Sequence, residues 1–345
     1  MAPRWRGLYD APTHSQRVLP LTGVSFICTV FDKRAYLARV IDALARQTGP
    51  FEREFIFVDD GSSDGSAAVI EECTRGWPDP VVILRQSNHG ASAATNAGVR
   101  RARLPWLKLV DGDDLLVPGA TAWLIAAAAA TQHSFAYGEL GTYRFDDPDP
   151  LARAFTAPDF AEEADGLTRF IRNVPCNSST ILVTAERYWA VGGCDERLVS
   201  PDAALFLRLF AGGGAAHLDG PVALVPDQAP RRLSEQTRRS RYESVLALYY
   251  LVTETPGLDR RYVGLAYRRA LSRARRFHRA HGGPLLSGHL LRDLAGLLRV
   301  PRAPESAIYQ ALAAFTEDGS TERPSTWLPG AFRRPRSDPL TAGKG

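Results

Sequence analysis

The sequence of 345 residues has no long apolar run, and it contains little cysteine. The longest uninterrupted apolar run covers residues 122–130, which is far shorter than the roughly 20 residues that cross a bilayer. The four cysteines have neither the spacing of a zinc finger nor that of a disulfide framework. The first residues include Arg4, Arg6 and Asp10 but no apolar stretch, so no signal peptide is expected. These absences favour a cytoplasmic protein.

The charge is unevenly distributed along a chain of otherwise ordinary globular composition. Residues 231–345 hold 21 basic and 10 acidic residues, a net charge of +11, whereas the rest holds 21 basic and 28 acidic residues, a net charge of −7. A basic C-terminal part predicts an anionic partner such as a membrane surface. Lysine occurs only at Lys33, Lys108 and Lys344, so the many arginines can equally reflect the coding bias of the source genome. No basic stretch carries interleaved aromatic residues in a nucleic-acid-binding motif, so nucleic acid is not expected as a partner.

Short apolar runs alternate with helical patterns in the N-terminal third of the chain. Apolar and β-branched residues predict strands at 24–29, 55–58, 81–84 and 106–110. The spacing of apolar residues predicts helices between them, at 36–44, up to about residue 75, and at 92–103. This strand–helix order indicates a mostly parallel sheet covered by helices.

The rest of the chain is expected to complete this layered domain and to add helices to it. Further helices are expected at 120–131 and 203–210, further strands at 179–183 and 222–225, and a loop or flap at 144–166. Arginine-rich helices are expected at 242–252, 262–280 and 285–300. We therefore expect four parts: an N-terminal arm (1–20), an α/β domain (21–228), a helical extension (229–300) and an irregular tail rich in Pro and Arg (301–345).

Acidic side chains cluster after two of the expected strands. Asp59-Asp60-Gly61-Ser62 follows the second strand, and Asp111-Gly112-Asp113-Asp114 follows the fourth. Ligands of parallel sheets bind beyond the carboxyl ends of the strands, so both clusters point to one site. Three neighbouring carboxylates repel one another, and Mg²⁺ or Mn²⁺ would relieve that repulsion. A solvated, aspartate-rich turn is the alternative for the second cluster.

Several segments, in this order, resemble the motifs of family 2 glycosyltransferases over residues 24–227. The resemblance rests on Thr29-Val30-Phe31-Asp32, residues 55–65, Asn88, Gly90, Asn96 and Gly98, residues 111–114, Gly192-Gly193-Cys194-Asp195-Glu196, and residues 201–208. It implies a GT-A fold, which is a Rossmann-like, mostly parallel central sheet flanked by helices, here with a C-terminal helical extension. It also implies that residues 21–228 form the glycosyltransferase domain.

The resemblance further implies an activity. The chain would be an inverting, hexosyltransferase-type enzyme that moves a sugar from a nucleoside diphosphate sugar, with UDP-sugar favoured, to a hydroxyl group. The acceptor would be a glycan or a lipid-linked molecule in the synthesis of cell-surface polysaccharide, lipopolysaccharide or glycolipid. The protein would be cytoplasmic, and it would lie peripherally on the inner face of the membrane if its basic part binds anionic lipid.

The resemblance also implies roles for single residues. Asp202 would be the general base that deprotonates the acceptor, although a plain helix N-cap is the alternative. Asp113 and Asp114 would hold Mg²⁺ or Mn²⁺. The nucleotide would be contacted by Thr29, Phe31, Asp59, Asp60, Asn88, Gly90, Asn96 and Asp111. Acceptor contacts are expected at Asn177, Asp195, Glu196 and Pro201, and Arg231 and Arg232 are expected in a loop that closes over the diphosphate, where a solvated basic linker is equally plausible.

Three departures from the family pattern leave a second function open. Pro201 replaces the usual glutamate, Thr95 replaces a frequent arginine, and Val30-Phe31 replaces Thr-Tyr. A catalytically degenerate protein that binds nucleotide sugars or acts as a scaffold is therefore the alternative, although the intact aspartates argue against it. The first strand ends in Thr29-Val30-Phe31-Asp32-Lys33, without the glycine-rich turn of a nucleotidyltransferase or of a dinucleotide dehydrogenase.

Overall fold

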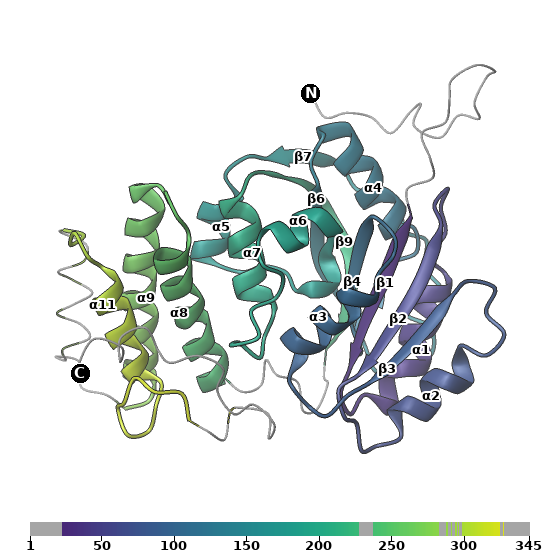
Figure 1. Ribbon diagram of the computed structural model, residues 1–345, viewed down its shortest axis with the longest axis horizontal. Coiled ribbons are helices and arrows are strands. Elements are labelled where there is room, and N and C mark those ends of the chain that lie inside the picture. Colours follow the sequence, from purple (N-terminus) through teal and green to yellow (C-terminus); the bar gives the residue numbers. More distant parts are fainter. Residues whose placement is uncertain are drawn as a thin grey trace.

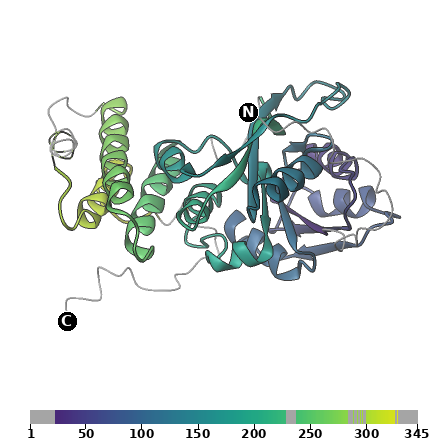
Figure 2. The same cartoon turned by 90° about the horizontal axis from the view of Figure 1, so that it is seen from above.

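The computed structural model describes residues 23–227, 237–282, 288, 291, 294, 296, 299–324 and 327. A layered α/β part forms one side of the molecule, and a group of helices formed by α8 (Thr237–Glu254), α9 (Arg260–Ala280) and α11 (Glu305–Gln310) forms the other (Figures 1 and 2). The expected arm (1–20), the two arginines Arg231 and Arg232, and most of the expected helix at 285–300 lie outside the described residues.

The strand–helix repeat of the first part is confirmed. Its elements are β1 (Val24–Val30), α1 (Arg34–Ala45), β2 (Arg53–Asp59), α2 (Ser66–Cys73), β3 (Val81–Arg85), α3 (Ala91–Arg101) and β4 (Trp106–Asp111). These four strands are parallel and lie in the order β3-β2-β1-β4. The chain therefore adds β2 and β3 on one side of β1 and then places β4 on the other side of β1. Such a reversal opens a crevice at the carboxyl ends of the two strands.

Helix α3 reaches β1 closely enough to make this reversal compact. A Cβ atom on Gly98 would lie 2.5 Å from Cγ2 of Ile27 in β1 and 3.0 Å from Cγ2 of Val58 in β2. Because those distances are shorter than any ordinary carbon contact, only glycine allows the helix to pack here.

The second part extends the sheet with mixed strand directions. It comprises β5 (Leu115–Leu116), α4 (Ala120–Thr131), β6 (Phe135–Tyr143), β7 (Phe160–Glu163), α5 (Gly166–Arg172), the 3₁₀ turn η1 (Ser178–Thr180), β8 (Ile181–Thr184), α6 (Ala185–Ala190), α7 (Asp202–Ala211) and β9 (Ala215–Pro226). The nine-stranded sheet continues from β4 in the order β8-β6-β9-β5, and β7 pairs with β9. Strand β8 is antiparallel to both of its neighbours, so the parallel arrangement holds for the first four strands and the remainder is mixed.

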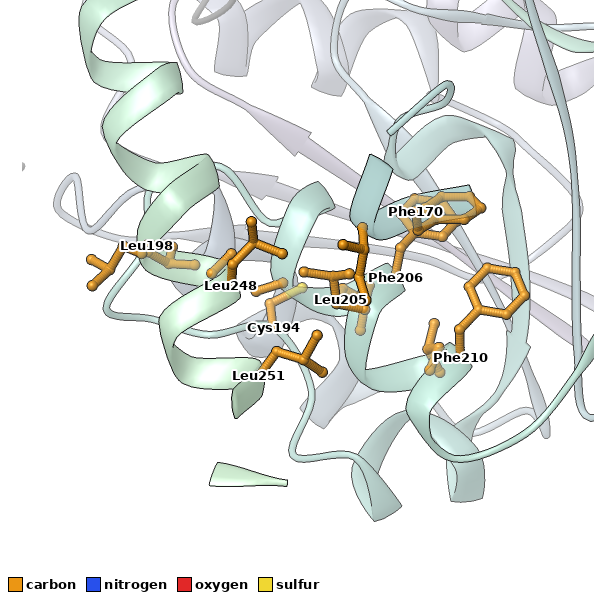
Figure 3. Close-up of a cluster of buried hydrophobic side chains, with 14 of the residues drawn as sticks. Phe170, Cys194, Leu198, Leu205, Phe206, Phe210, Leu248 and Leu251 are labelled. Atoms are coloured by element: carbon orange, nitrogen blue, oxygen red, sulfur yellow. The ribbon is translucent and has the colours of Figure 1, made fainter. Parts of the chain in front are cut away.

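Alternate residues of the strands feed two apolar cores, one on each face of the sheet. Phe55 and Phe57 of β2 belong to the core beneath α1, α2 and α4, whereas Ile56 and Val58 belong to the core beneath α3, α5 and α7. The second core continues without a break into α8, α9 and α11. Figure 3 shows Leu248 and Leu251 of α8 beside Leu205 of α7 and beside Cys194 and Leu198 of the preceding loop.

The expectation of an irregular tail from residue 301 is wrong for its first part. Helix α11 and the 3₁₀ turn η3 (Ala311–Ala314) pack on α8 and α9. Ile308, Leu312 and Phe315 are fully buried there, because their spacing of three to four residues places them on one helical face. Within the described residues, no helix has both the length and the apolar character of a membrane span.

Candidate active site

The two acidic segments meet at one edge of the sheet. Thr29 in β1 is the register partner of Asp111 in β4, and Val30 is the partner of Asp59 in β2. The backbone N–H of Asp60 donates to the carbonyl oxygen of Val30 at 2.8 Å. The ends of β2, β1 and β4 therefore present their carboxylates to the same crevice, as the sequence predicts.

Asp113 lies at the centre of this edge. A tight turn brings it there, with Asp114 N–H donating to the carbonyl oxygen of Asp111 at 3.0 Å. Gly112 is required in this turn because a Cβ atom would lie 2.9 Å from the carbonyl oxygen of Thr29. The side chain of Asp113 accepts a hydrogen bond from Nζ of Lys33 at 2.7 Å. The ammonium group of Lys33 therefore already contacts this carboxylate.

Negative charge is crowded around Asp111. Burial, followed by the carboxylates of Asp114, Asp202 and Asp113, raises the pKa of Asp111 well above its usual range, while Lys33 offsets part of the effect. Such crowding is what a divalent cation relieves. No three His, Cys, Asp or Glu side chains among the described residues form a complete metal site. The carboxylates of Asp111 and Asp113 are the kind of ligand that Mg²⁺ takes, an ion commonly held by one or two protein carboxylates together with phosphate oxygens and water.

Asp114 faces inward and is held by the 3₁₀ turn. It is fully buried, and its Oδ2 accepts hydrogen bonds from Nδ2 of Asn177 at 2.5 Å and from Oγ of Ser179 at 2.8 Å. Asn177 also donates to Oδ2 of Asp111 at 3.4 Å, and its own Oδ1 caps the turn by accepting from Ser179 N–H. Asn177, expected as an acceptor contact, therefore braces the turn at residues 111–114.

A fully buried lysine beneath this turn was missed by the sequence analysis. Nζ of Lys108 in β4 donates to the carbonyl oxygens of Ser179 at 2.5 Å and Leu109 at 3.0 Å. Burial lowers the pKa of Lys108 to about 7, and the carboxylates of Asp111 and Asp114 act in the opposite direction. A lysine inside the apolar strand at 106–110 was the signal that pointed to it. Lys108 fixes the turn that carries Asn177 and Ser179, so it is a positioning residue.

Asp202 approaches the same turn from the other side. It is the first residue of α7, and its Oδ1 accepts hydrogen bonds from the N–H of Ser178 at 2.8 Å and from its Oγ at 2.6 Å. Its charge is close enough to raise the pKa of Asp111. Pro201, expected as an acceptor contact, is buried. The structure thus brings Asp202 and the Asp111 turn together across η1.

The aspartates after β2 differ in their surroundings. Asp60 is buried, and its oxygens accept hydrogen bonds from Gln86 Nε2 at 2.8 Å, His89 N–H at 2.9 Å and Gly90 N–H at 2.8 Å. It therefore braces the loop before α3. Asp59 accepts a hydrogen bond from Ser62 N–H through Oδ1 at 2.9 Å. Of the two, Asp59 has the fewer protein partners.

The other residues expected to contact the nucleotide surround the mouth of the crevice. Thr29 is partly exposed at the end of β1, and the ring of Phe31 is 46% exposed. Asn88 and Gly90 lie in the loop between β3 and α3, directly beside the loop after β2, since a Cβ atom on Gly61 would lie 2.9 Å from the backbone nitrogen of Asn88. The structure brings these residues together with Asp59 and Asp111.

Asn96 is not part of that group, which corrects the expectation of a nucleotide contact. Its Nδ2 donates to the carbonyl oxygen of Cys194 at 2.9 Å and to Oε1 of Glu196 at 2.8 Å. Its Oδ1 accepts from Tyr188 Oη at 2.6 Å and from Cys194 N–H at 3.0 Å. Both amide atoms are therefore saturated by the protein. Asn96 anchors the loop at residues 192–196.

Asp195 and Glu196 are also engaged within the protein. Asp195 forms a two-pronged ion pair with Arg197, which in turn pairs with Glu254 of α8. Glu196 accepts hydrogen bonds from Asn96 and Arg100. Both acidic residues therefore tie this loop to its neighbours, and their expected acceptor contacts have no support in the geometry.

Comparison with known proteins finds similarity to glycosyltransferases. The model of glycosyl transferase family 2 matches residues 25–175. The minor teichoic acid biosynthesis protein GgaB of Bacillus subtilis is 31% identical over 96 residues, which cover 28% of this chain and 11% of GgaB. The succinoglycan biosynthesis protein ExoO of Rhizobium meliloti is 25% identical over 336 residues and 92% of each chain.

A solved structure has the same fold. The crystal structure of S. aureus TarS 1-349 in complex with UDP-GlcNAc matches with a TM-score of 0.57 and 16% identity, over 85% of this chain and 84% of that one. The match to GgaB spans far less than two thirds of that relative, whereas those to ExoO and TarS span most of each. The acidic turns after β2 and β4 both lie in residues 25–175, the part of the chain that matches glycosyl transferase family 2, and the chain has the GT-A fold.

Proposed function

We propose that this chain is an active, metal-dependent, inverting glycosyltransferase that takes a hexose from a nucleoside diphosphate sugar. The observation that carries the proposal is the convergence of Asp111, Asp113 and Asp202 at one edge of the sheet, around the turn at Ser178. An inverting transfer needs one carboxylate at the acceptor oxygen and positive charge at the departing diphosphate. Both requirements have candidates within this small region.

The donor would occupy the crevice between β1 and β4, with UDP-sugar favoured. Asp59 would accept the N–H of the base, Phe31 would cover the nucleotide, and Thr29, Asn88 and Gly90 would line its remaining contacts. TarS was crystallised with UDP and with UDP-GlcNAc, which supports this type of donor. Asp60 would keep the loop before α3 in place.

Asp113 and Asp111 are the residues that would hold Mg²⁺ or Mn²⁺. The sequence predicts that Asp113 and Asp114 hold the metal. We propose Asp111 in place of Asp114, because Asp114 is fully buried and accepts hydrogen bonds from Asn177 and Ser179. When bound, such an ion supplies positive charge that stabilises the leaving diphosphate. Lys33, which contacts Asp113 at 2.7 Å, would add a second positive charge on the same side.

Asp202 would accept the proton of the acceptor hydroxyl. Ser178 holds one carboxylate oxygen through two hydrogen bonds, which fixes the orientation of the group. The acceptor oxygen would attack the anomeric carbon from the face opposite the diphosphate, and the bond from that carbon to the diphosphate oxygen would break. Attack from the opposite face inverts the anomeric centre.

The acceptor would be a glycan or a lipid-linked molecule. The names of ExoO and GgaB place those relatives in the synthesis of succinoglycan and of minor teichoic acid, which supports a role in cell-surface polymers. We assign catalysis to residues 21–228, with α8, α9 and α11 packed against them. A cytoplasmic location on the inner face of the membrane fits this role.

Replacement of Asp202 by asparagine tests the proposal. Asp202→Asn should bind UDP with Mn²⁺ as the unmodified protein does, because the base does not contact the nucleotide. Its rate of UDP release from UDP-sugar should fall on the order of 10²- to 10⁴-fold. Asp219→Asn, which changes an exposed carboxylate on β9, is the matched control and should leave the rate unchanged.

Calorimetry for binding and a coupled assay for UDP release separate the outcomes. Near-normal turnover by Asp202→Asn would exclude this residue as the base. Nucleotide binding by the unmodified protein without turnover on any donor would favour the alternative, a degenerate protein that binds nucleotide sugars, which the proline at position 201 motivates.

A further inference from the structure

Four arginines gather where α5, α8 and α9 meet, away from the carboxylates of the active site. They are Arg241 of α8 and Arg269, Arg273 and Arg276 of α9, and the three helices lie side by side (Figure 1). Arg273 lies between them, because its Nη1 donates to the carbonyl oxygen of Ser244 in α8 at 3.0 Å and its Nη2 to that of Ile171 in α5 at 3.5 Å.

The four side chains differ in their exposure to solvent. Arg273 is only 8% exposed, Arg269 is partly exposed, and Arg241 and Arg276 are exposed. Arg273 is therefore the most deeply buried of the four, at the floor of the group, and the exposed Arg241 and Arg276 form its rim. We call this group the arginine basin.

The positive charge of the arginine basin has no negative counterpart within the described residues. Other arginines of these helices form ion pairs, namely Arg238 with Glu317, Arg239 with Glu243, and Arg261 with Asp165. Arg241, Arg269, Arg273 and Arg276 pair with no carboxylate in the described part of the chain. Burial, and then the guanidinium groups of Arg269, Arg241 and Arg276, lower the pKa of Arg273 to about 9. The described residues therefore leave this repulsion uncompensated.

Hydrogen-bond donors in the basin are also unsatisfied. The Nε atoms of Arg269 and Arg273 are buried and have no hydrogen-bond partner among the residues that the structure describes. A buried donor without an acceptor is costly, and water, an ion or a ligand can supply the missing acceptor. Guanidinium groups bind phosphate through parallel N–H bonds, and a phosphate carries both the oxygen acceptors and the negative charge that are missing here.

A membrane face that combines these arginines with exposed leucines is the competing explanation. Leu291 and Leu294 are exposed, and a Cβ atom on Gly296 would lie 3.0 Å and 3.2 Å from the side chains of Tyr267 and Leu271 in α9. Both Tyr267 and Leu271 lie two residues from Arg269, which corresponds to about 200° around an α-helix. Gly296 therefore packs on a different face of α9 from the one that carries Arg269, and binding to anionic vesicles decides whether the arginine basin contacts a membrane.

We propose that the arginine basin binds a phosphate group, at a site separate from the donor crevice. Arg273 and Arg269 would bind its oxygens at the floor, and Arg241 and Arg276 would close around it from the rim. The phosphate can belong to a soluble phosphorylated molecule or to a lipid headgroup, since both present the same chemistry to the arginines.

Thermal unfolding in inorganic phosphate tests this site. The measurement compares phosphate with chloride at constant ionic strength, with EDTA present so that binding at the donor crevice is suppressed. Phosphate should raise the Tm of the unmodified protein by about 2 °C or more. The double variant Arg241→Gln/Arg276→Gln should lose this rise, and its Tm without phosphate should not fall, because the repulsion is relieved.

The matched control removes the same charge elsewhere on α9. Arg260→Gln/Arg279→Gln changes two exposed arginines that do not act on Arg273, so this variant should keep the phosphate response. An equal response in the rim variant, or no response in the unmodified protein, would show that the four arginines have only a structural role.

Two further measurements identify the source of the phosphate and separate this site from the donor site. In the first, the protein is sedimented with phosphatidylglycerol or phosphatidylcholine vesicles. Binding to phosphatidylglycerol vesicles alone, and its loss in the rim variant Arg241→Gln/Arg276→Gln, would identify the phosphate as that of a lipid headgroup. A phosphate response without vesicle binding would assign a soluble phosphorylated molecule. Stabilisation by UDP with Mn²⁺ should be the same in the rim variant and the unmodified protein, so failure of one site does not imply failure of the other.

Discussion

Polar side chains around the acidic turn act mainly by holding one another in place. Asn177 and Ser179 donate to the buried Asp114, and Lys108 fixes the backbone of Ser179 from below. Asp114 therefore does not need to contact the proposed metal ion in order to influence its site. Its hydrogen bonds keep the turn in the conformation that presents Asp111 and Asp113 to the crevice.

Replacement of Asn96 tests the reassignment of this residue from nucleotide contact to loop anchor. Asn96→Ala leaves the hydroxyl of Tyr188 without its buried acceptor and the carbonyl oxygen of Cys194 without the donor that Asn96 supplies. We expect the free energy of unfolding to fall by about 2 kcal/mol or more, while the affinity for UDP stays unchanged. Urea unfolding and calorimetry measure the two quantities.

Asn173→Ala, at an exposed position after α5, is the control for this experiment and should change neither quantity appreciably. Loss of UDP affinity in Asn96→Ala at unchanged stability would restore the original interpretation of Asn96 as a nucleotide contact.

Individual elements are joined by a few buried polar contacts as well as by the cores. Glu54 of β2 accepts hydrogen bonds from Oγ of Ser25 in β1 at 2.6 Å and from the backbone N–H and Nε of Arg103 at 2.6 Å and 2.9 Å. Because Arg103 lies between α3 and β4, this one carboxylate connects the central strands to the connection that leads into the acidic turn.

The pH dependence of stability should report on Glu54. Burial acts to raise its pKa, but the hydrogen bonds from Ser25 and Arg103 outweigh burial and hold the pKa below its usual value. The folded pKa is therefore below the unfolded one of about 4.3. Its contribution is fully present above the unfolded pKa and is lost as pH falls through the folded pKa.

Glu54→Gln should therefore lower stability at pH 7 and flatten the loss of stability below about pH 4. Urea unfolding at pH 7 and pH 3 measures this difference, with Glu52→Gln at an exposed neighbouring position as the control. An unchanged pH dependence in Glu54→Gln would mean that its hydrogen bonds do not discriminate between the two protonation states.

Elements with a regular pattern could be predicted from the sequence, and those set by distant partners could not. The first four strands and their helices follow from apolar spacing alone. Strand β6 was missed because Gly138 and Gly141 interrupt its pattern, and Gly138 is needed there, since a Cβ atom would lie 2.5 Å from Val222 of β9. Asn96 and Asn177 were recognised as important, but their partners lie 98 and 63 residues away in the chain, so only the fold reveals their contacts.

The whole molecule has one continuous core on the side of α3, α5 and α7. This core joins α7 to α8, α9 and α11, so the boundary expected near residue 228 does not separate two apolar interiors. Differential scanning calorimetry should consequently show a single cooperative transition for the full chain. Two separate transitions would contradict this account and favour independent domains.

A pair of leucine variants tests the same contact. Leu251→Ala removes a buried side chain at the junction of α8 with the loop at Cys194, and it should lower the free energy of unfolding by about 2 to 5 kcal/mol. Leu291→Ala changes a side chain that is 65% exposed and should stay within about 0.5 kcal/mol of the unmodified protein. Equal effects would mean that α8 contributes little to the core.

Metal-dependent nucleotide binding tests the central claim most directly. Thermal unfolding with UDP and GDP, each with Mn²⁺, with Mg²⁺ or with EDTA, should be compared for the unmodified protein and for Asp113→Asn. We predict that UDP raises the Tm only when a divalent ion is present, and that Asp113→Asn abolishes this rise without unfolding the protein. The claim would be contradicted if neither nucleotide raised the Tm, or if the rise were equal in EDTA and in Asp113→Asn.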